Sequence, residues 1–211
     1  MNPRKQGETS YKETAFGIIP RSKLIPLEIE GIKRAWDFIL SRHKKGKIII
    51  TSSFIKKLHE VGFVWIFPKI GGKFRKIEVT VSKHTPPKFY LIPELMENYC
   101  QDIRTRLKHL PTINNVGFLD ELVEFLAWIH HKFLWIHPFQ DYNGRIGRLL
   151  ISVVLLNLDL LPVELKVETK QGRRKYVQAL READSGDYTK LEKIIKLAIE
   201  ESIKELEDIK K

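Results

Sequence analysis

Residues 137–148 read HPFQDYNGRIGR and lie between two long apolar segments of the chain. Before this stretch, apolar residues recur at the three- and four-residue spacing of a helix, and residues 149–161 after it form the most apolar part of the sequence. Pro138 ends the first helix because proline has no N–H and cannot continue it. We therefore predict a loop that opens a second helix, whose free N–H groups attract phosphate.

The first residues of this second helix suit an anion site. Asn143 and Gly144 allow the backbone to turn tightly and to approach an anion closely. Arg145 and Arg148 are three positions apart, so they occupy neighbouring positions on the helix surface. Each guanidinium group can bind phosphate oxygens with two hydrogen bonds. These four residues are the candidate phosphate ligands.

Two further side chains of the stretch supply chemistry beside that anion site. Asp141 is a hard oxygen ligand that suits Mg²⁺ held jointly with phosphates. His137 is a base whose ordinary pKa lies near neutral pH. Phe139 is expected to enter the core and to hold the loop in shape. Each element alone occurs in ordinary turns, but the combination predicts a site for phosphoryl or nucleotidyl transfer.

The rest of the chain predicts a mostly α protein with one small β-hairpin. Helical spacing is found in residues 26–46, 53–61, 93–109, the segment that ends before Pro138, 143–160, 175–183 and the part that begins at Thr189. β-branched and aromatic residues at 63–67, a Gly71-Gly72 turn and partial alternation over 75–81 predict the hairpin. Residues 1–23 are polar and basic and are interpreted as a mobile arm, followed by a single domain over 24–211.

Composition and charge narrow the class of protein and of partner. Of 211 residues, 43% are hydrophobic and 30% charged, so the chain can bury a core and is not disordered. The net charge of +11 indicates an anionic partner, and nucleic acid, an anionic membrane surface and a nucleotide all fit. Residues 149–161 are too short to cross a bilayer, which argues against membrane insertion. Cys100 is the only cysteine, so a reducing, cytoplasmic location is expected.

Residues 137–148 resemble the signature of the Fic family, H-x-F-x-[DE]-G-N-G-R-x-x-R. The residues that match are His137, Phe139, Asp141, Asn143, Gly144, Arg145 and Arg148. Residues 128–131 and 176–184 resemble the helices on either side of that signature, and residues 72–75 resemble the family's hairpin flap. The resemblance implies a Fic-like helical bundle, with an inhibitory helix, the flap and connecting helices in 24–110, the Fic core in 111–200 and the end of the last helix in 201–211.

The resemblance implies a protein adenylyltransferase. Such an enzyme moves AMP from ATP, with Mg²⁺, to a hydroxyl of a target protein, which could be the chain itself, and releases pyrophosphate. His137 would take the proton from that hydroxyl, Asp141 would hold Mg²⁺, and the four candidate phosphate ligands would keep their role. The flap, Gly72-Lys73-Phe74-Arg75, would hold an extended target segment by adding strand hydrogen bonds.

Two other functions stay open. Doc-like kinases of the same fold phosphorylate their targets and carry lysine where this sequence has Gly144, so the glycine favours adenylyl transfer. The second alternative is a non-catalytic basic binding module with a decayed site, against which the retained His137 and Asp141 argue. Nucleic acid is a less favoured partner than a nucleotide and a protein substrate, and a homodimer is compatible with the sequence.

Two positions match the family's pattern only in part. Tyr142 stands where the signature has glycine, and if the loop needs a positive φ there, tyrosine costs about 1–2 kcal/mol. Many members carry an inhibitory helix, [ST]-x-x-x-E-[GN], whose glutamate pairs with the second signature arginine. Glu30 and Gly31 match its end, with Pro26 at the Ser/Thr position. Glu30 is therefore the predicted inhibitory residue, acting on Arg148.

Overall fold

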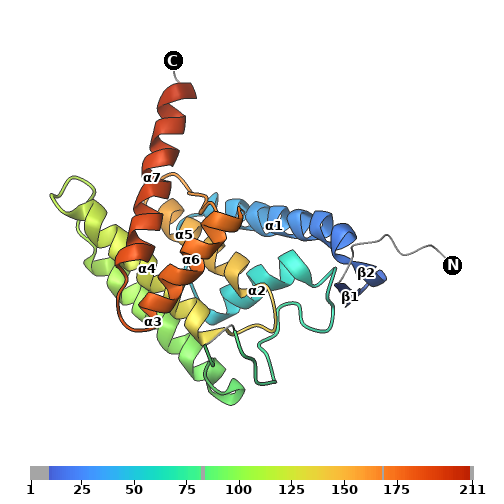
Figure 1. Cartoon of the computed structure of the whole chain (residues 1–211). Helices are drawn as coiled ribbons and strands as arrows, with labels where there is room; N and C mark the ends of the chain where they lie inside the picture. The colour runs from blue at the N-terminus through green and yellow to red at the C-terminus, as the bar shows by residue number, and fades with distance from the viewer. Residues whose placement is uncertain (1–9, 82–83, 168, 210–211) are drawn as a thin grey trace.

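The computed structural model of the chain describes residues 10–81, 84–167 and 169–209. The described elements, in chain order, are β1 (Tyr11–Thr14), β2 (Gly17–Pro20), α1 (Arg21–His43), α2 (Ser52–Phe63), the short 3₁₀ turn η1 (Phe89–Leu91), α3 (Ile92–His109), α4 (Phe118–Ile136), α5 (Asn143–Asn157), α6 (Lys170–Ala183) and α7 (Thr189–Ile209). Helices α1, α2 and α4 pack against α5, and α7 extends beyond the body of the protein at its C-terminal end (Figure 1). The prediction of a mostly α fold with one small hairpin is confirmed.

The position of that hairpin was predicted wrongly. Residues 63–67 do not form a strand, because α2 runs through Phe63 and its buried face continues into the turn at Ile66. Residues 74 and 139 instead form a single antiparallel bridge, which ties the predicted flap to the loop that follows α4. Apolar β-branched and aromatic residues suit a buried helix end as well as a strand, so the pattern was ambiguous.

The hairpin forms in the segment predicted to be a mobile arm. In β1 and β2, Tyr11 pairs with Pro20 and Thr14 with Gly17, whose φ of 85° permits the tight turn. The polar character of this segment hid its structure, because the hairpin depends on contacts with the body of the protein. Its backbone N–H at Ala15 donates to the carbonyl of Ile66 at 2.8 Å. The first nine residues of the predicted arm lie outside the described residues.

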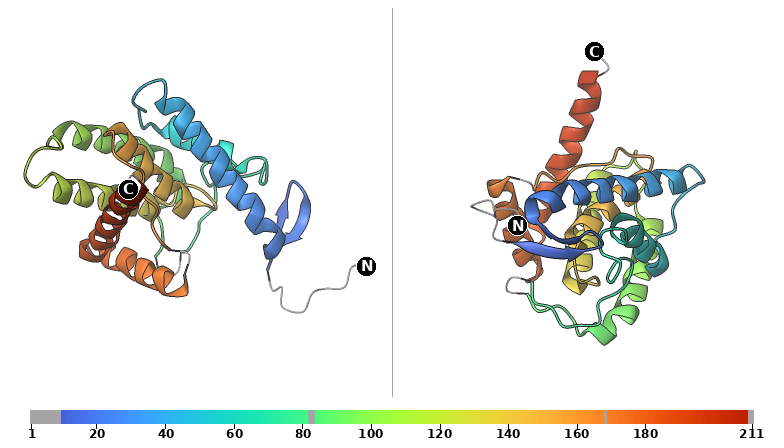
Figure 2. Two further views of the ribbon diagram at one scale, coloured as in Figure 1. Left: turned by 90° about the horizontal axis from the view of Figure 1, so that it is seen from above. Right: turned by 90° about the vertical axis from the view of Figure 1, so that its right-hand side faces the viewer.

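Helices α4 and α5 form the centre of the fold and hold the 137–142 loop between them (Figure 2). Most of α5 is buried, as its apolar sequence predicts, and it packs against α4 along its length. Ser152 and Asn157 are also buried there, and the Asn157 side chain bonds both backbone groups of Ile48 at 2.8 Å. The residues that flank the loop, Ile136 and Asn143, are themselves buried, so the core fixes both of its ends. Within the described ranges, no helix is long and apolar enough to cross a membrane.

Helix α1 approaches α2 closely where two glycines face each other. A Cβ atom added to Gly31 would lie 2.4 Å from the carbonyl oxygen of Gly62, a backbone atom that cannot turn aside. Replacement of Gly31 by alanine should therefore lower the free energy of unfolding by about 1–3 kcal/mol, because the two helices must move apart. Urea unfolding measures the change. Lys33→Ala, on the exposed face of the same helix, is the matched control, and an equal loss in both variants would contradict the proposed clash.

Candidate active site

The loop between α4 and α5 is held in one shape by its own side chains. Its backbone bends into the left-handed region at His137, with φ 50°, and at Tyr142, with φ 64°. Asn143 directly follows the second bend. Its side-chain Oδ1 accepts from the N–H of Phe139 at 2.9 Å, and its Nδ2 donates to the carbonyl of Phe139 at 2.8 Å. Phe139 is fully buried, as predicted, and anchors the loop in the core. Asn143 thus acts on the loop backbone, which is how it shapes the pocket.

His59 of α2 supports the same loop from outside. Its Nδ1 accepts from the N–H of Gly72 at 2.9 Å, so the proton lies on Nε2, which donates to the carbonyl of Asp141 at 3.2 Å. Its ring stacks on Phe139 at 3.9 Å between centroids. Burial lowers the pKa of His59 to about 4, so the ring is neutral at pH 7. No pattern in the sequence identified His59, because its partners are distant along the chain.

His137 presents one nitrogen to a cavity. Its Nδ1 lies 3.4 Å from the carbonyl oxygen of Leu134, which can only accept, so the proton resides on Nδ1 and the Nε2 lone pair is free. Burial lowers the pKa of His137 to about 4, and the positive charge of Arg75 acts in the same direction. At pH 7 the imidazole is therefore neutral and able to accept a proton. This is the state that a general base requires.

Arg75, which the sequence predicted to dock a target, is buried and holds the backbone beside His137. Its side chain is fully buried and donates to the carbonyls of His137 at 2.9 Å, Ile77 at 2.9 Å and Pro87 at 2.5 Å. Its backbone N–H donates to the carbonyl of Pro138 at 2.9 Å. The guanidinium group therefore fixes the backbone beside the candidate base. The target-docking role of residues 72–75 stays a prediction.

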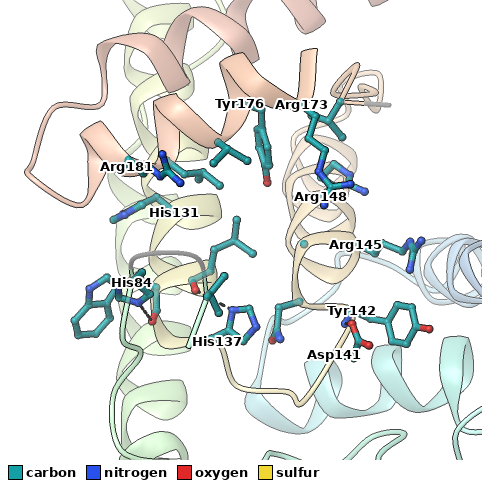
Figure 3. Close-up of a pocket in the computed structure, with 18 of the residues that line it drawn as sticks. His84, His131, His137, Asp141, Tyr142, Arg145, Arg148, Arg173, Tyr176 and Arg181 are labelled. Carbon is teal, nitrogen blue, oxygen red and sulfur yellow. Dashed lines mark hydrogen bonds between the residues drawn. The ribbon is translucent and has the colours of Figure 1, made fainter. Parts of the chain in front are cut away.

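The two signature arginines have different partners. Arg145 donates to a carboxylate oxygen of Glu28 at 2.7 Å. Arg148 folds back over the start of α5, where its guanidinium lies 3.7 Å from the position of a Cβ atom on Gly144. Both line one cavity with His137 (Figure 3).

Asp141 is the carboxylate of the loop that could hold a metal ion. One oxygen accepts from the N–H of Tyr142 at 2.8 Å, the other faces Lys12, and the side chain is 38% exposed toward the cavity. Among the described residues, no group of three metal-binding side chains comes together. A single hard carboxylate with an accessible oxygen fits Mg²⁺, which is commonly bound by one or two carboxylates, waters and substrate phosphates.

The cavity around these groups has a volume of about 820 Å³ and is strongly cationic. Its charged lining, within the described part of the chain, consists of Lys12, Arg21, Arg145, Arg148, Arg173 and Arg181 against Glu28, Asp141 and Asp184. Arg173 and Arg181 come from α6 and were not singled out by the sequence analysis (Figure 3). A volume of this size accepts a small-molecule ligand, and the excess of positive charge favours an anionic one.

The positive φ expected at residue 142 is present, and the tyrosine there is well packed. Its ring stacks on Phe63 with centroids 4.0 Å apart and planes inclined by 10°. Its hydroxyl donates to Glu28 at 2.8 Å, and burial raises the pKa of Tyr142 far above its ordinary value. These contacts offset the backbone strain that the sequence predicted.

The structure does not bring Glu30 and Arg148 together. Glu30 is half-exposed and pairs with Arg34 at 3.1 Å, one turn along α1. The carboxylate that reaches the loop is Glu28, which is 2% exposed and also accepts from Arg21 at 2.8 Å. Sequence reasoning missed Glu28, because the face that α1 presents to the loop cannot be read from a five-residue motif. The inhibitory role of Glu30 stays a prediction without contact to its expected partner.

The fold and the site define a helical protein in which the start of α5 lines a cationic cavity, with a neutral histidine beside it. The model of the Fic/DOC family matches residues 49–155, which is half of the chain, and the chain therefore belongs to that family. The matched range includes the signature residues 137–148, as the resemblance in sequence implied.

Named relatives and solved structures agree with this assignment. The chain is 30% identical over 178 residues to "Protein adenylyltransferase Fic" of Aedes aegypti, and 32% identical to the protein of that name from Drosophila melanogaster. It covers 33% and 34% of those proteins, so it spans about a third of their length, while 84% of the chain is matched. Residues 134–508 of Fic-1 from C. elegans superpose with a TM-score of 0.67 and 26% identity, over 87% of this chain and 51% of that one. BepC of Bartonella tribocorum, with bound AMPPNP, shares the fold at a TM-score of 0.66 and 17% identity, over 92% and 94% of the two chains.

Proposed function

We propose that this protein is a protein adenylyltransferase, which transfers AMP from ATP to a hydroxyl side chain of a protein and releases pyrophosphate. The observation that carries the proposal is the convergence of His137, Asp141 and Arg148 on one cationic cavity at the start of α5. The activity named for the relatives supports it. A cytoplasmic location and a homodimer stay predictions.

Each group then has a defined part in the reaction. Nε2 of His137 accepts the proton of the target hydroxyl as its oxygen attacks the α-phosphate, and the bond from that phosphorus to the β-phosphate oxygen breaks. Arg148 and the start of α5 bind the outer phosphates and stabilise the negative charge on the leaving pyrophosphate. Asp141 would hold Mg²⁺, which neutralises phosphate charge when it is bound. Arg75 and His59 position the loop by their backbone contacts.

The position of the radioactive label tests the reaction type. ATP labelled at the α-phosphate should mark protein, and ATP labelled at the γ-phosphate should not, because only the α-phosphorus is attacked. The purified chain, alone and with a cell extract, is incubated with each nucleotide and Mg²⁺. Label from the γ-position alone would move the assignment to the kinase alternative, which Gly144 opposes. Absence of label from both nucleotides under all conditions would favour the binding module.

We also propose that a carboxylate of α1 restrains a signature arginine, and the contacts support Glu28 rather than Glu30. Glu28 neutralises Arg145 at 2.7 Å, so this guanidinium is shared between the carboxylate and any incoming phosphate. Replacement by glutamine keeps an acceptor for Tyr142 and removes the charge.

Glu28→Gln should raise the rate of self-labelling from α-labelled ATP about tenfold, because a hydrogen bond to a charged group is worth about 1.5–3 kcal/mol. Adding Arg145→Ala should cancel that gain. Glu30→Gln is the matched control on the same helix, with a carboxylate that pairs with Arg34 one turn along α1. A gain in the Glu30 variant alone would return the inhibitory role to the residue that the sequence motif indicates.

A further inference from the structure

The N-terminal hairpin places a cation on the candidate metal ligand. Lys12 of β1 donates from its Nζ to the Oδ2 oxygen of Asp141. The same Nζ lies 5.8 Å from the ring centroids of both Tyr142 and Phe67, so the ammonium group sits over two aromatic faces. The remaining carboxylate oxygen accepts from the N–H of Tyr142. Lys12 therefore covers the oxygen that a metal ion would use.

This position of Lys12 follows from docking of the whole hairpin. The backbone of Ala15 bonds to Ile66, as described above, and the ring of Phe16 meets Trp65 edge-on at 5.9 Å. The hairpin lies beside the N-terminal end of α1 and next to α2 (Figure 1). Contacts at the turn thus hold the hairpin, and with it Lys12, beside Asp141 independently of the Lys12 side chain.

We propose that Lys12 competes with the divalent metal ion for Asp141, so that the hairpin sets the metal concentration at which the site loads. An ammonium group and a hard divalent cation both seek the same carboxylate oxygen, and they repel each other if both are present. This inference rests on the proposed function, because it takes Asp141 as the metal ligand. The side chains of Lys12 and Asp141 are 45% and 38% exposed. Solvent therefore screens their attraction, and we expect Lys12 to have a modest effect on metal affinity.

Binding of AMPPNP to the full chain, measured by calorimetry with Mg²⁺ or with EDTA, tests the competition without using activity. Lys12→Met should tighten binding of the Mg²⁺ complex about two- to fivefold and should weaken binding of the metal-free nucleotide. Tighter binding with Mg²⁺ combined with weaker binding in EDTA distinguishes competition for Asp141 from a long-range attraction between Lys12 and the nucleotide. The Mg²⁺ complex of AMPPNP is still an anion, so loss of a cation that acted only at long range would weaken both. Lys12→Arg keeps the charge and should restore the parent's affinity.

Two further variants distinguish failure of the proposed competition from a wrong assignment of the metal ligand. Lys33→Met removes a charge of the same kind from the exposed face of α1, does not alter the cavity lining, and should not tighten binding of the Mg²⁺ complex. Asp141→Asn should abolish the difference between Mg²⁺ and EDTA. If it does, and Lys12→Met binds the Mg²⁺ complex no more tightly than the parent, the competition is overturned while the proposed function stands. If the difference persists in Asp141→Asn, the metal ligand is assigned wrongly and the competition fails, while the label experiment still decides the proposed function.

Discussion

Replacement of His137 by alanine should lower the rate of AMP transfer by about 10²–10⁴-fold while nucleotide binding persists, because the imidazole acts on the target hydroxyl and not on the phosphates. The free Nε2 lone pair and the low pKa of His137, about 4, keep the base unprotonated through the neutral range. The rate should therefore show no loss through protonation of His137 between pH 8 and pH 6. Transfer of label from α-labelled ATP and calorimetric binding of AMPPNP measure the two quantities separately.

Two variants distinguish loss of the base from damage to the fold or to the cavity. The backbone at His137 is left-handed, and asparagine tolerates that region better than alanine, so His137→Asn should fold and be equally inactive. His84 is the matched control, because it lines the same cavity and its Nε2 bonds the carbonyl of Trp135 at 2.9 Å. His84→Ala should retain most of the transfer. Full transfer by the His137 variants with loss in the His84 variant would reassign the base.

The local part of the site could be predicted because its residues are close in sequence. The spacing in residues 137–148 fixes a loop, a helix start and two arginines on neighbouring positions of α5. It also identified Phe139 as the buried anchor, since an apolar ring between polar residues has few other uses. The positive φ at Tyr142 was foreseen from the glycine that the signature places there.

The parts that escaped prediction depend on tertiary contacts. Two residues along a helix correspond to a rotation of about 200°, so the docking of α1 decides whether Glu28 or Glu30 faces the loop. His59 bonds to a carbonyl 82 residues away, a contact that no local pattern encodes. Half of the residues in the hairpin of Lys12 are apolar, but Phe16 and Ile18 are exposed, and the hairpin is ordered through its contacts with the body, as at Ala15. The polar and basic composition of residues 1–23 as a whole made this segment resemble a mobile arm.

Lowering the pH from 7 to 5 should reduce the free energy of unfolding by about 6 kcal/mol, chiefly through three histidines whose pKa values burial lowers. His59 and His130 are fully buried and His137 is partly buried, and burial lowers their pKa values to about 4, about 3 and about 4, against an ordinary value of 6.5. Below pH 6.5 the unfolded chain binds a proton at each ring while the folded chain does not, so stability falls with pH. At pH 5 each group contributes a loss of about 2 kcal/mol, since one pH unit corresponds to 1.36 kcal/mol. The loss continues until the pH passes below the folded-state pKa values.

Urea unfolding at pH 7, 6 and 5 measures this loss, and substitution shows its origin. His59→Gln should lower the slope of stability against pH by about a third, because glutamine can still bond the Asp141 carbonyl and takes up no proton. His109→Gln, at an exposed site on α3, should leave the slope as it is in the parent chain. The first sign of acid damage should be local, because protonation of Nδ1 in His59 ends its bond from Gly72 and loosens the segment around Gly72, while Nε2 still donates to the Asp141 carbonyl. A slope that is the same in the parent and in His59→Gln would show that the loop is stable without this histidine, and that the acid sensitivity arises elsewhere.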